Sequence, residues 1–185
     1  MKTALLIVDI QNDYFPGGAM QLVGSPEAGE KAARLLAAFR ERGAPVIHMQ
    51  HVSRRPGAAF FVEGTEGVKI HECVAPLASE TVFRKHFPNS FRETPLADHL
   101  RAQGAGRLVV AGMMTHMCID TTARAAADLG FEVQLAHDAC ATRDLAFGGV
   151  TVAAREVQAA FVASLNGLFA KALTVAEILA APPAA

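Results

Sequence analysis

The amino-acid sequence predicts an α/β protein with a doubly wound, mainly parallel six-stranded sheet and helices on both faces of it. Two observations support this prediction. Short apolar runs of strand length recur along the 185 residues, and amphipathic helical patterns separate most of them. Parallel neighbours need crossover connections, and strands buried on both faces are apolar throughout. The alternation therefore predicts a single domain over residues 1–185, with the helices as crossovers.

The first strand and helix illustrate the pattern. Residues 5–8 form an apolar run that ends at Asp9, as expected for a buried strand. The next helix begins with Ser25 as a suitable N-cap and Pro26 at the first helical position, and it ends at Gly43. The further predicted strands cover residues 45–52, 81–85, 107–112, 131–136 and 172–174.

Helical patterns follow most of these strands. One begins at Cys118, shortly after the strand that ends at Gly112, and the longest is amphipathic. Residues 181–185 contain two prolines and are expected to fray. The predicted helices after the first one cover residues 94–104, 118–129, 150–170 and 176–181.

One long segment, residues 53–80, has no clear period. It contains glycine, proline and the adjacent pair Phe60 and Phe61. Irregular stretches of this length in a compact domain usually carry function. We interpret this segment as a pocket wall or a contact between subunits.

Composition excludes several classes of partner. The net charge is −1 and basic and acidic residues are interspersed, so neither nucleic acid nor a membrane surface is an expected partner. No stretch reaches the roughly 18 apolar residues of a membrane span. The three cysteines form no CxxC pair, which argues against a disulfide framework or a cysteine zinc site. These features predict a cytoplasmic protein that acts on a small molecule.

Polar side chains end the first strands of the predicted sheet. Asp9 ends the first strand, His51 the second and Lys85 the third, and the fourth leads into a turn before Cys118. In open α/β sheets, ligands bind beyond the carboxyl ends of the strands. The fold should therefore bring a carboxylate, an ammonium group and a thiol to one edge, although they are distant in sequence.

These groups have the chemistry of an activated nucleophile. A helix N-terminus should favour the thiolate of Cys118 and lower its pKa. Asp9 can take the thiol proton and later return it to a leaving amine, while Lys85 can favour the thiolate and orient the carboxylate. Backbone N–H groups of the turn can stabilise the oxyanion of a tetrahedral intermediate.

Three segments, taken together, resemble the isochorismatase-like cysteine hydrolases. They are LIVDIQNDYF at residues 6–15, RK at 84–85 followed by NSF at 89–91, and AGMMTHMC at 111–118. That family includes nicotinamidases, carbamoylsarcosine amidohydrolases and streptothricin hydrolases, and the resemblance covers nearly the whole chain. It implies a Rossmann-like hydrolase fold and homo-oligomers such as dimers or tetramers.

The resemblance also implies roles for individual residues. The catalytic triad would be Asp9, Lys85 and Cys118, and the oxyanion hole would be the backbone N–H groups of Met114 and Cys118. The peptide bond between Met113 and Met114 would be cis. Residues that flank these segments are candidates for the substrate pocket: Gln11, Phe15, His51, Phe91, Thr115 and His116.

No metal and no cofactor are expected. Nicotinamidases carry a metal site near the end of the second strand, with an aspartate two residues before a histidine. In this sequence Met49 precedes His51, and Gly57 and Phe60 stand where further ligands would align. His51 is therefore expected to line the pocket or to form a hydrogen bond within it.

The sequence thus predicts a cofactor-free hydrolase that cleaves a C–N bond of a small amide, lactam or carbamoyl compound through a thioester. Two alternatives stay open. An isochorismatase-type vinyl-ether hydrolase would need Asp9 but no thiol nucleophile. A non-catalytic binding member of the family would have a Cys118 of ordinary reactivity.

Overall fold

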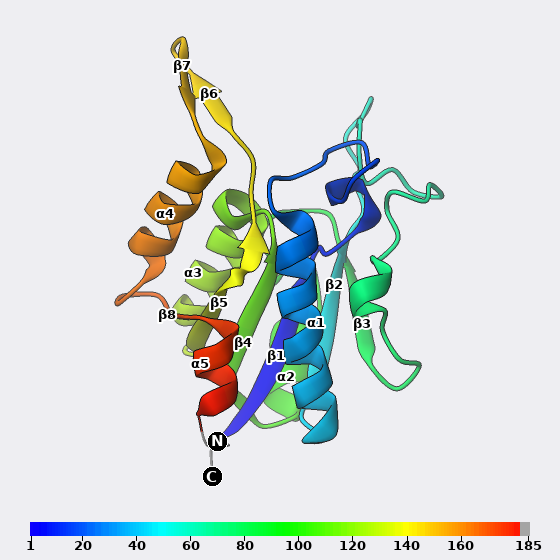
Figure 1. The fold of residues 1–185 in the computed structure, drawn as a ribbon. Coiled ribbons are helices and arrows are strands. Elements are labelled where there is room, and N and C mark those ends of the chain that lie inside the picture. The colour runs from blue at the N-terminus through cyan, green and yellow to red at the C-terminus, as the bar shows by residue number, and fades with distance from the viewer. Residues whose placement is uncertain (182–185) are drawn as a thin grey trace.

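The computed structural model describes residues 1–181 and contains a six-stranded parallel sheet in the order β3-β2-β1-β4-β5-β8 (Figure 1). Every neighbouring pair in this sheet is parallel. The predicted fold class is thereby confirmed. The strands are β1 (Lys2–Val8), β2 (Val46–His51), β3 (Thr81–Lys85), β4 (Ala105–Met113), β5 (Glu132–Ala141) and β8 (Lys171–Leu173).

The strand order reverses between β1 and β4. The chain runs from β1 outward to β2 and β3, and β4 then returns to the other side of β1. Loops that leave two such strands diverge over opposite faces of the sheet and leave a crevice at their carboxyl ends. The carboxyl ends of β1 and β4 are therefore the place where this fold favours a ligand site.

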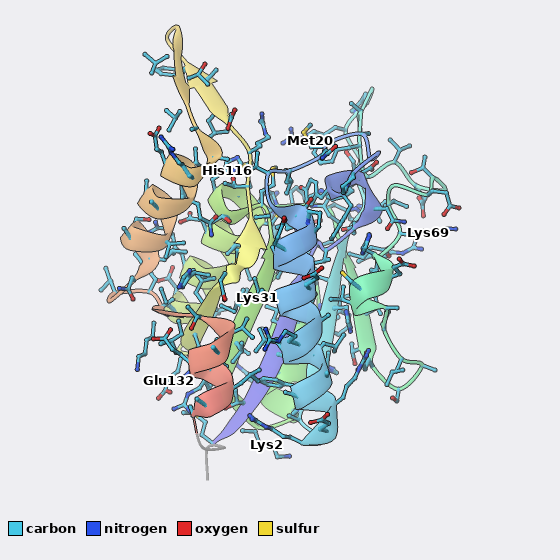
Figure 2. The ribbon with its side chains drawn as sticks, viewed as in Figure 1. Lys2, Met20, Lys31, Lys69, His116 and Glu132 are labelled. Atoms are coloured by element: carbon cyan, nitrogen blue, oxygen red, sulfur yellow. The ribbon has the colours of Figure 1, made fainter. Side chains whose placement is uncertain are left out.

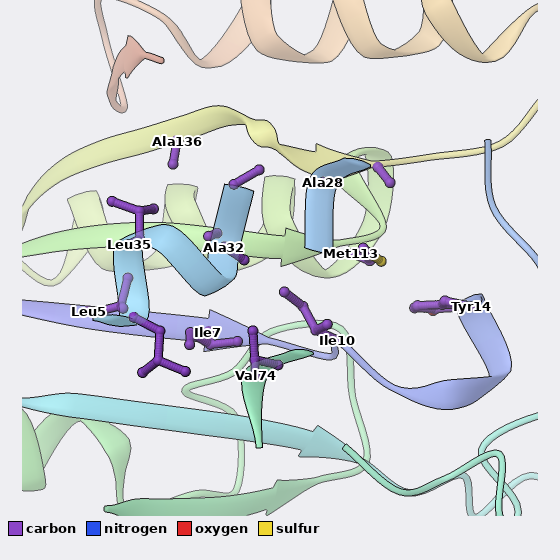
Figure 3. Packing of buried hydrophobic residues seen from close by; sticks show 14 of the residues in the cluster. Leu5, Ile7, Ile10, Tyr14, Ala28, Ala32, Leu35, Val74, Met113 and Ala136 are labelled. Carbon is purple, nitrogen blue, oxygen red and sulfur yellow. The ribbon is translucent and has the colours of Figure 1, made fainter. Parts of the chain in front are cut away.

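Helices cover both faces of the sheet (Figure 1). On one face α1 and α5 pack over β1 and β5, and Figure 3 shows Ala32 and Leu35 of α1 directed toward the sheet. Successive side chains of β1 point to opposite faces of the sheet. Leu5 belongs to the core beneath α1, and Leu6 belongs to the core on the other face. The helices are α1 (Ser25–Glu41), α2 (Leu96–Ala102), α3 (Asp120–Asp128), α4 (Ala154–Leu165) and α5 (Val175–Ala180).

The start of α1 differs from the prediction. Ser25 is the first helical residue, and the N-cap is Gly24, which has a left-handed φ of 73°. The Ser25 hydroxyl donates a hydrogen bond to the Leu22 carbonyl at 3.3 Å, so it does not cap the helix. The assignment of Ser25 as N-cap was therefore wrong, although the position of the helix was right.

The predicted helix over residues 150–170 is a larger correction. Its first residues belong to a β-hairpin of β6 (Leu145–Phe147) and β7 (Val150–Val152), which projects from the body of the molecule (Figure 1). Gly148 and Gly149 have φ values of 58° and 79°, which suit the tight turn of a hairpin. The helix α4 begins only after this turn and ends at Leu165.

The fifth strand is also longer than predicted, since β5 continues to Ala141 rather than ending at residue 136. A register shift between Val110 and Gly112 of β4 lets the pairing continue as far as Met113 and Ala141. Residues 182–185, which include most of the predicted frayed tail, lie outside the described residues. No helix within residues 1–181 has the length and apolar character needed to cross a membrane.

Candidate active site

Four of the predicted strand-end residues lie together at the carboxyl edge of the sheet. Asp9 directly follows β1, while His51 and Lys85 are the last residues of β2 and β3 and are paired in register. Cys118 lies in a π-helical turn, η3 (Thr115–Ile119), between β4 and α3. The strands that flank the reversal of strand order thus carry the carboxylate and the thiol.

The Lys85 ammonium group is the centre of this cluster. Its Nζ atom lies 2.8 Å from Asp9 Oδ2, 3.2 Å from Cys118 Sγ and 3.1 Å from His51 Nδ1. It also donates to the carbonyls of Phe87 at 3.0 Å and Pro88 at 3.4 Å. The side chains of Lys85 and Asp9 are both fully buried. The ammonium group therefore lies within hydrogen-bonding distance of carboxylate, thiol and imidazole at once.

The ion pair keeps Lys85 charged despite its burial. Burial by itself lowers the pKa of a lysine, but the Asp9 carboxylate and the Cys118 sulfur outweigh it and raise the pKa of Lys85 above its usual value. The second carboxylate oxygen, Asp9 Oδ1, is buried and has no hydrogen-bond partner among residues 1–181. That oxygen is available to accept a proton.

The thiol of Cys118 is protonated in the resting site. Burial, followed by the neighbouring Asp9 carboxylate, raises the pKa of Cys118 well above its usual value, although Lys85 acts in the opposite direction. The prediction that the helix N-terminus lowers this pKa was wrong. Cys118 is 4% exposed, so burial disfavours the thiolate.

Backbone geometry places the thiol. Asp9 has a left-handed φ of 52°, a conformation that is uncommon for a residue with a side chain and that is found in clusters at functional sites. A Cβ on Gly112, where φ is 137°, would lie 1.9 Å from the Val8 carbonyl oxygen. The bond between Met113 and Met114 is cis, and the Met114 carbonyl accepts from Met117 N at 3.1 Å and Ile119 N at 3.2 Å. The backbone N–H groups of Met114 and Cys118 thus belong to the turn that holds the Cys118 thiol, and their oxyanion role stays a prediction.

Gln11 was predicted to line the substrate pocket but lies in the protein interior. It is fully buried, its Oε1 accepts from His51 N at 2.7 Å, and its Nε2 donates to the carbonyls of His51 at 3.0 Å and Val68 at 2.7 Å. All of its hydrogen-bonding atoms are therefore occupied within the protein. Gln11 positions the end of β2 and does not line a pocket.

Thr115 also belongs to the interior. It is fully buried, and its hydroxyl contacts the Ala141 carbonyl at 3.2 Å and Gln158 Oε1 at 2.5 Å. His116 is partly exposed, and its Nδ1 lies 2.6 Å from the Thr142 hydroxyl oxygen. Figure 2 shows His116 at the end of the molecule from which the hairpin rises, opposite Lys2. Of this pair, only His116 is placed where a ligand could reach it.

The two predicted pocket phenylalanines pack elsewhere. Phe15 stacks on the ring of His71 with centroids 3.6 Å apart, in the core beneath α1. Phe91 stacks on Phe131 at 6.0 Å, against the core on the opposite face. Apolar packing against neighbouring elements places both rings, so the structure does not bring them together as a pocket wall.

Two residues near the site were missed by sequence reasoning. Tyr14 is buried beyond the end of β1 (Figure 3), and burial, Cys118 and Asp9 raise the pKa of its hydroxyl well above the usual value. Arg143 is exposed, has no ion pair within residues 1–181, and interacts electrostatically with Tyr14 and His116. Arg143 follows the true end of β5, so the strand-end rule would have found it had that strand been predicted at its full length.

The irregular segment after β2 reaches this cluster through Phe61. The Phe61 ring lies 5.7 Å from the His51 ring and 4.6 Å from the Tyr14 ring, and Phe61 N donates to Asp13 Oδ2 at 2.6 Å. Phe61 is buried in the core, so the segment contacts the cluster, and its two interpretations as a pocket wall or a subunit contact stay predictions.

Asp9, His51 and Cys118 offer metal-type donor atoms within 4.8 Å of one another. The Lys85 ammonium lies within 3.2 Å of all three donors. A metal ion would have to displace this buried positive charge, so the arrangement disfavours a cation at that point.

The fold and this site define an isochorismatase-like hydrolase. Residues 3–177 match the model of the isochorismatase domain, and the chain belongs to that family.

Particular relatives resemble the chain over most of its length. The isochorismatase family protein YddQ of Bacillus subtilis is 50% identical over 97% of this chain and 99% of its own. The maleamate amidohydrolase of Pseudomonas putida is 33% identical over 77% of this chain and 73% of its own. The crystal structure of an isochorismatase hydrolase from Oleispira antarctica has a TM-score of 0.94 at 48% identity and covers 97% of both chains. These proteins show the family and the fold.

Proposed function

We propose that this protein hydrolyses a C–N bond of a small amide, lactam or carbamoyl compound, with Cys118 as the nucleophile. The observation that carries the proposal is the buried cluster in which Lys85 lies 2.8 Å from Asp9 Oδ2 and 3.2 Å from Cys118 Sγ. A protonated thiol beside a buried carboxylate with a free oxygen is a nucleophile and its base. The similarity to an enzyme named maleamate amidohydrolase agrees with amide chemistry.

In the first half of the reaction Asp9 takes the proton from Cys118 Sγ, and the sulfur attacks the carbonyl carbon. The resulting oxyanion accepts hydrogen bonds from the backbone N–H groups of Met114 and Cys118, and each such donor is worth about 10²–10³ in rate. The C–N bond then breaks, and Asp9 returns the proton to the leaving nitrogen. Ammonia or an amine departs and leaves a thioester.

In the second half Asp9 accepts a proton from water as the water oxygen attacks the thioester carbon. The C–S bond breaks, the carboxylic acid leaves, and the proton returns to Cys118. Lys85 keeps its positive charge throughout, because its contacts with Asp9 and Cys118 raise its pKa. It therefore compensates whichever of the two groups is negative at each step.

The test is release of ammonia or amine from a panel of small amides, lactams and carbamoyl compounds, in buffer with a metal chelator. The panel includes members with and without a carboxylate, since Arg143 leaves an unpaired positive charge near His116 in the described chain. Turnover that iodoacetamide abolishes supports a cysteine hydrolase. Turnover that survives full alkylation of Cys118 indicates a reaction without a thiol nucleophile, such as vinyl-ether hydrolysis.

The first prediction is that Cys118→Ala lowers kcat to the background rate without unfolding the protein. The matched control is Cys73→Ala, which removes a half-buried thiol whose pKa burial raises to about 11. That variant should keep both activity and sensitivity to iodoacetamide. Normal turnover by Cys118→Ala would refute the mechanism.

A further inference from the structure

His51 touches the catalytic cluster, yet the proposed mechanism assigns it no step. Its Nδ1 atom lies 3.1 Å from Lys85 Nζ and 3.9 Å from Asp9 Oδ2, and its side chain is 17% exposed. A histidine in this position could act on the substrate, on Lys85 or on both. The hydrogen-bond chemistry of its two ring nitrogens decides between these roles.

The contact with Lys85 determines the tautomer of His51. An ammonium group has only protons to donate, so Nδ1 must be the acceptor and must itself carry no proton. The ring is neutral, because burial lowers the pKa of His51 to about 4. The titratable groups that act on it electrostatically are Asp9, Lys85, His86 and Arg55. At neutral pH the single ring proton is therefore on Nε2.

The Nε2–H group is the unused donor of this ring. It has no hydrogen-bond partner within residues 1–181, and it is not among the buried side-chain atoms that lack a partner. Solvent can therefore reach it. Since Nδ1 meets Lys85, Nε2 lies on the more distant side of the ring, where a bound molecule would replace water.

The backbone of His51 is held in place by Gln11. The buried Gln11 amide accepts from His51 N at 2.7 Å and donates to His51 O at 3.0 Å. The Phe61 ring lies beside the imidazole at 5.7 Å. A hydrogen-bond donor that is fixed on both sides in this way costs little entropy when it binds a partner.

We propose, on the basis of the proposed hydrolase function, that His51 is a substrate-binding residue whose Nε2–H donates to an oxygen acceptor of the substrate, while its Nδ1 positions Lys85. The substrate then carries, besides the scissile group, a carbonyl or carboxylate oxygen on the side of β2. A compound that presents an N–H group at that point meets a second donor and binds more weakly.

Two substitutions separate the functions of the two ring nitrogens. In His51→Asn the amide oxygen reaches about as far as Nδ1, so it can still accept from Lys85, but nothing replaces Nε2–H. In His51→Gln the amide reaches about as far as Nε2 and can supply a donor there. The rate of Cys118 alkylation by iodoacetamide, followed against pH, monitors the state of Lys85 and the thiol without any substrate.

The kinetic test measures kcat and KM of these variants with the best substrate of the panel. We expect His51→Asn to lower kcat/KM about tenfold, mainly through KM, with an alkylation profile like that of the wild type. His51→Gln should recover part of the loss. Equal kcat/KM for His51→Asn and the wild type would overturn the proposal. Absence of turnover in the wild-type protein would instead contradict the proposed function.

A second measurement needs no turnover. The ¹⁵N chemical shifts of the His51 ring in the full-length protein report which nitrogen is protonated. A proton on Nε2 alone, from pH 7 down to about pH 5, is the expected result. A proton on Nδ1, or a doubly protonated ring at pH 7, would overturn the proposal whatever the substrate is.

Discussion

Lys85 makes more polar contacts than the other side chains of the site. Its three protons face Asp9, His51, Cys118 and two backbone carbonyls, and its side chain is fully buried. A buried charge is tolerated only where a partner compensates its desolvation. We therefore expect the pair of Lys85 and Asp9 to stabilise this edge of the sheet, in addition to the catalytic role that the proposed mechanism assigns to it.

Removing one partner should have a large effect on stability. We expect Lys85→Met to lower the free energy of unfolding by about 3 kcal/mol, because Asp9 is then buried without a cation. Urea denaturation at pH 7 measures this change. The double variant Asp9→Asn/Lys85→Met should recover part of the loss, since it leaves no unpaired charge. A double variant with the summed loss of the two single variants would contradict this account.

At the scale of elements, the junction of β1, β4 and η3 positions the Cys118 thiol. Val8 and Gly112 are partners in register, and their backbones approach so closely that a side chain on Gly112 has no room. Asp9 leaves β1 next to this contact, and Cys118 follows β4 by one turn. The separation of carboxylate and thiol thus depends on a backbone contact rather than on side-chain packing.

Gly112→Ala should disrupt this junction. The new Cβ would lie 1.9 Å from the Val8 carbonyl oxygen, and φ of 137° is unfavourable for alanine. We expect a loss of about 3 kcal/mol or more in the free energy of unfolding, together with loss of activity. The control is Gly148→Ala, where φ is 58° and no atom lies within 4 Å, so the loss should be near 1 kcal/mol. Similar losses for both variants would show that backbone conformation alone, not the close approach, decides the effect.

For the whole molecule, the reversal of strand order brings the site together. Asp9, His51 and Lys85 lie at the carboxyl ends of three adjacent strands, and Cys118 follows the strand on the other side of β1. Groups more than 100 residues apart therefore meet in one buried cluster. The burial that this produces also makes the stability of the whole protein depend on pH.

His51 makes the stability of the folded protein depend on pH in the mildly acidic range. Its pKa is lowered to about 4 in the folded protein, whereas an unfolded histidine has a pKa of about 6.5. Between these values the unfolded chain binds a proton that the folded protein does not, so stability falls as the pH is lowered from 6.5 to 4. We expect His51 to account for about 2 to 3 kcal/mol of that fall. Denaturation curves of the wild type and His51→Asn at several pH values measure it, and parallel pH dependence of the two would contradict it.

Apolar periodicity in the sequence predicted the parallel sheet and most of its helices, because burial on both faces leaves a continuous pattern. It failed at residues 150–170, because the glycine turn at residues 148–149 makes residues 150–152 part of a hairpin and the helix begins only at Ala154. It also failed at the end of β5, whose last residues pair only because β4 shifts register. The first failure was a missed local turn signal, whereas the second depends on a contact with another strand that local pattern does not contain.

The sequence by itself determined the fold class, the family resemblance and the grouping of Asp9, Lys85 and Cys118 at one edge of a sheet, since strand ends in a parallel fold share that edge. Only the tertiary structure decided that the thiol is protonated, that Gln11 and Thr115 are interior residues, and that Tyr14 lies near Cys118 and Asp9 with Arg143 acting on it electrostatically. The physical reason is that pKa values and exposure depend on neighbours distant in sequence. Burial and the distance between charges exist only once the chain has folded.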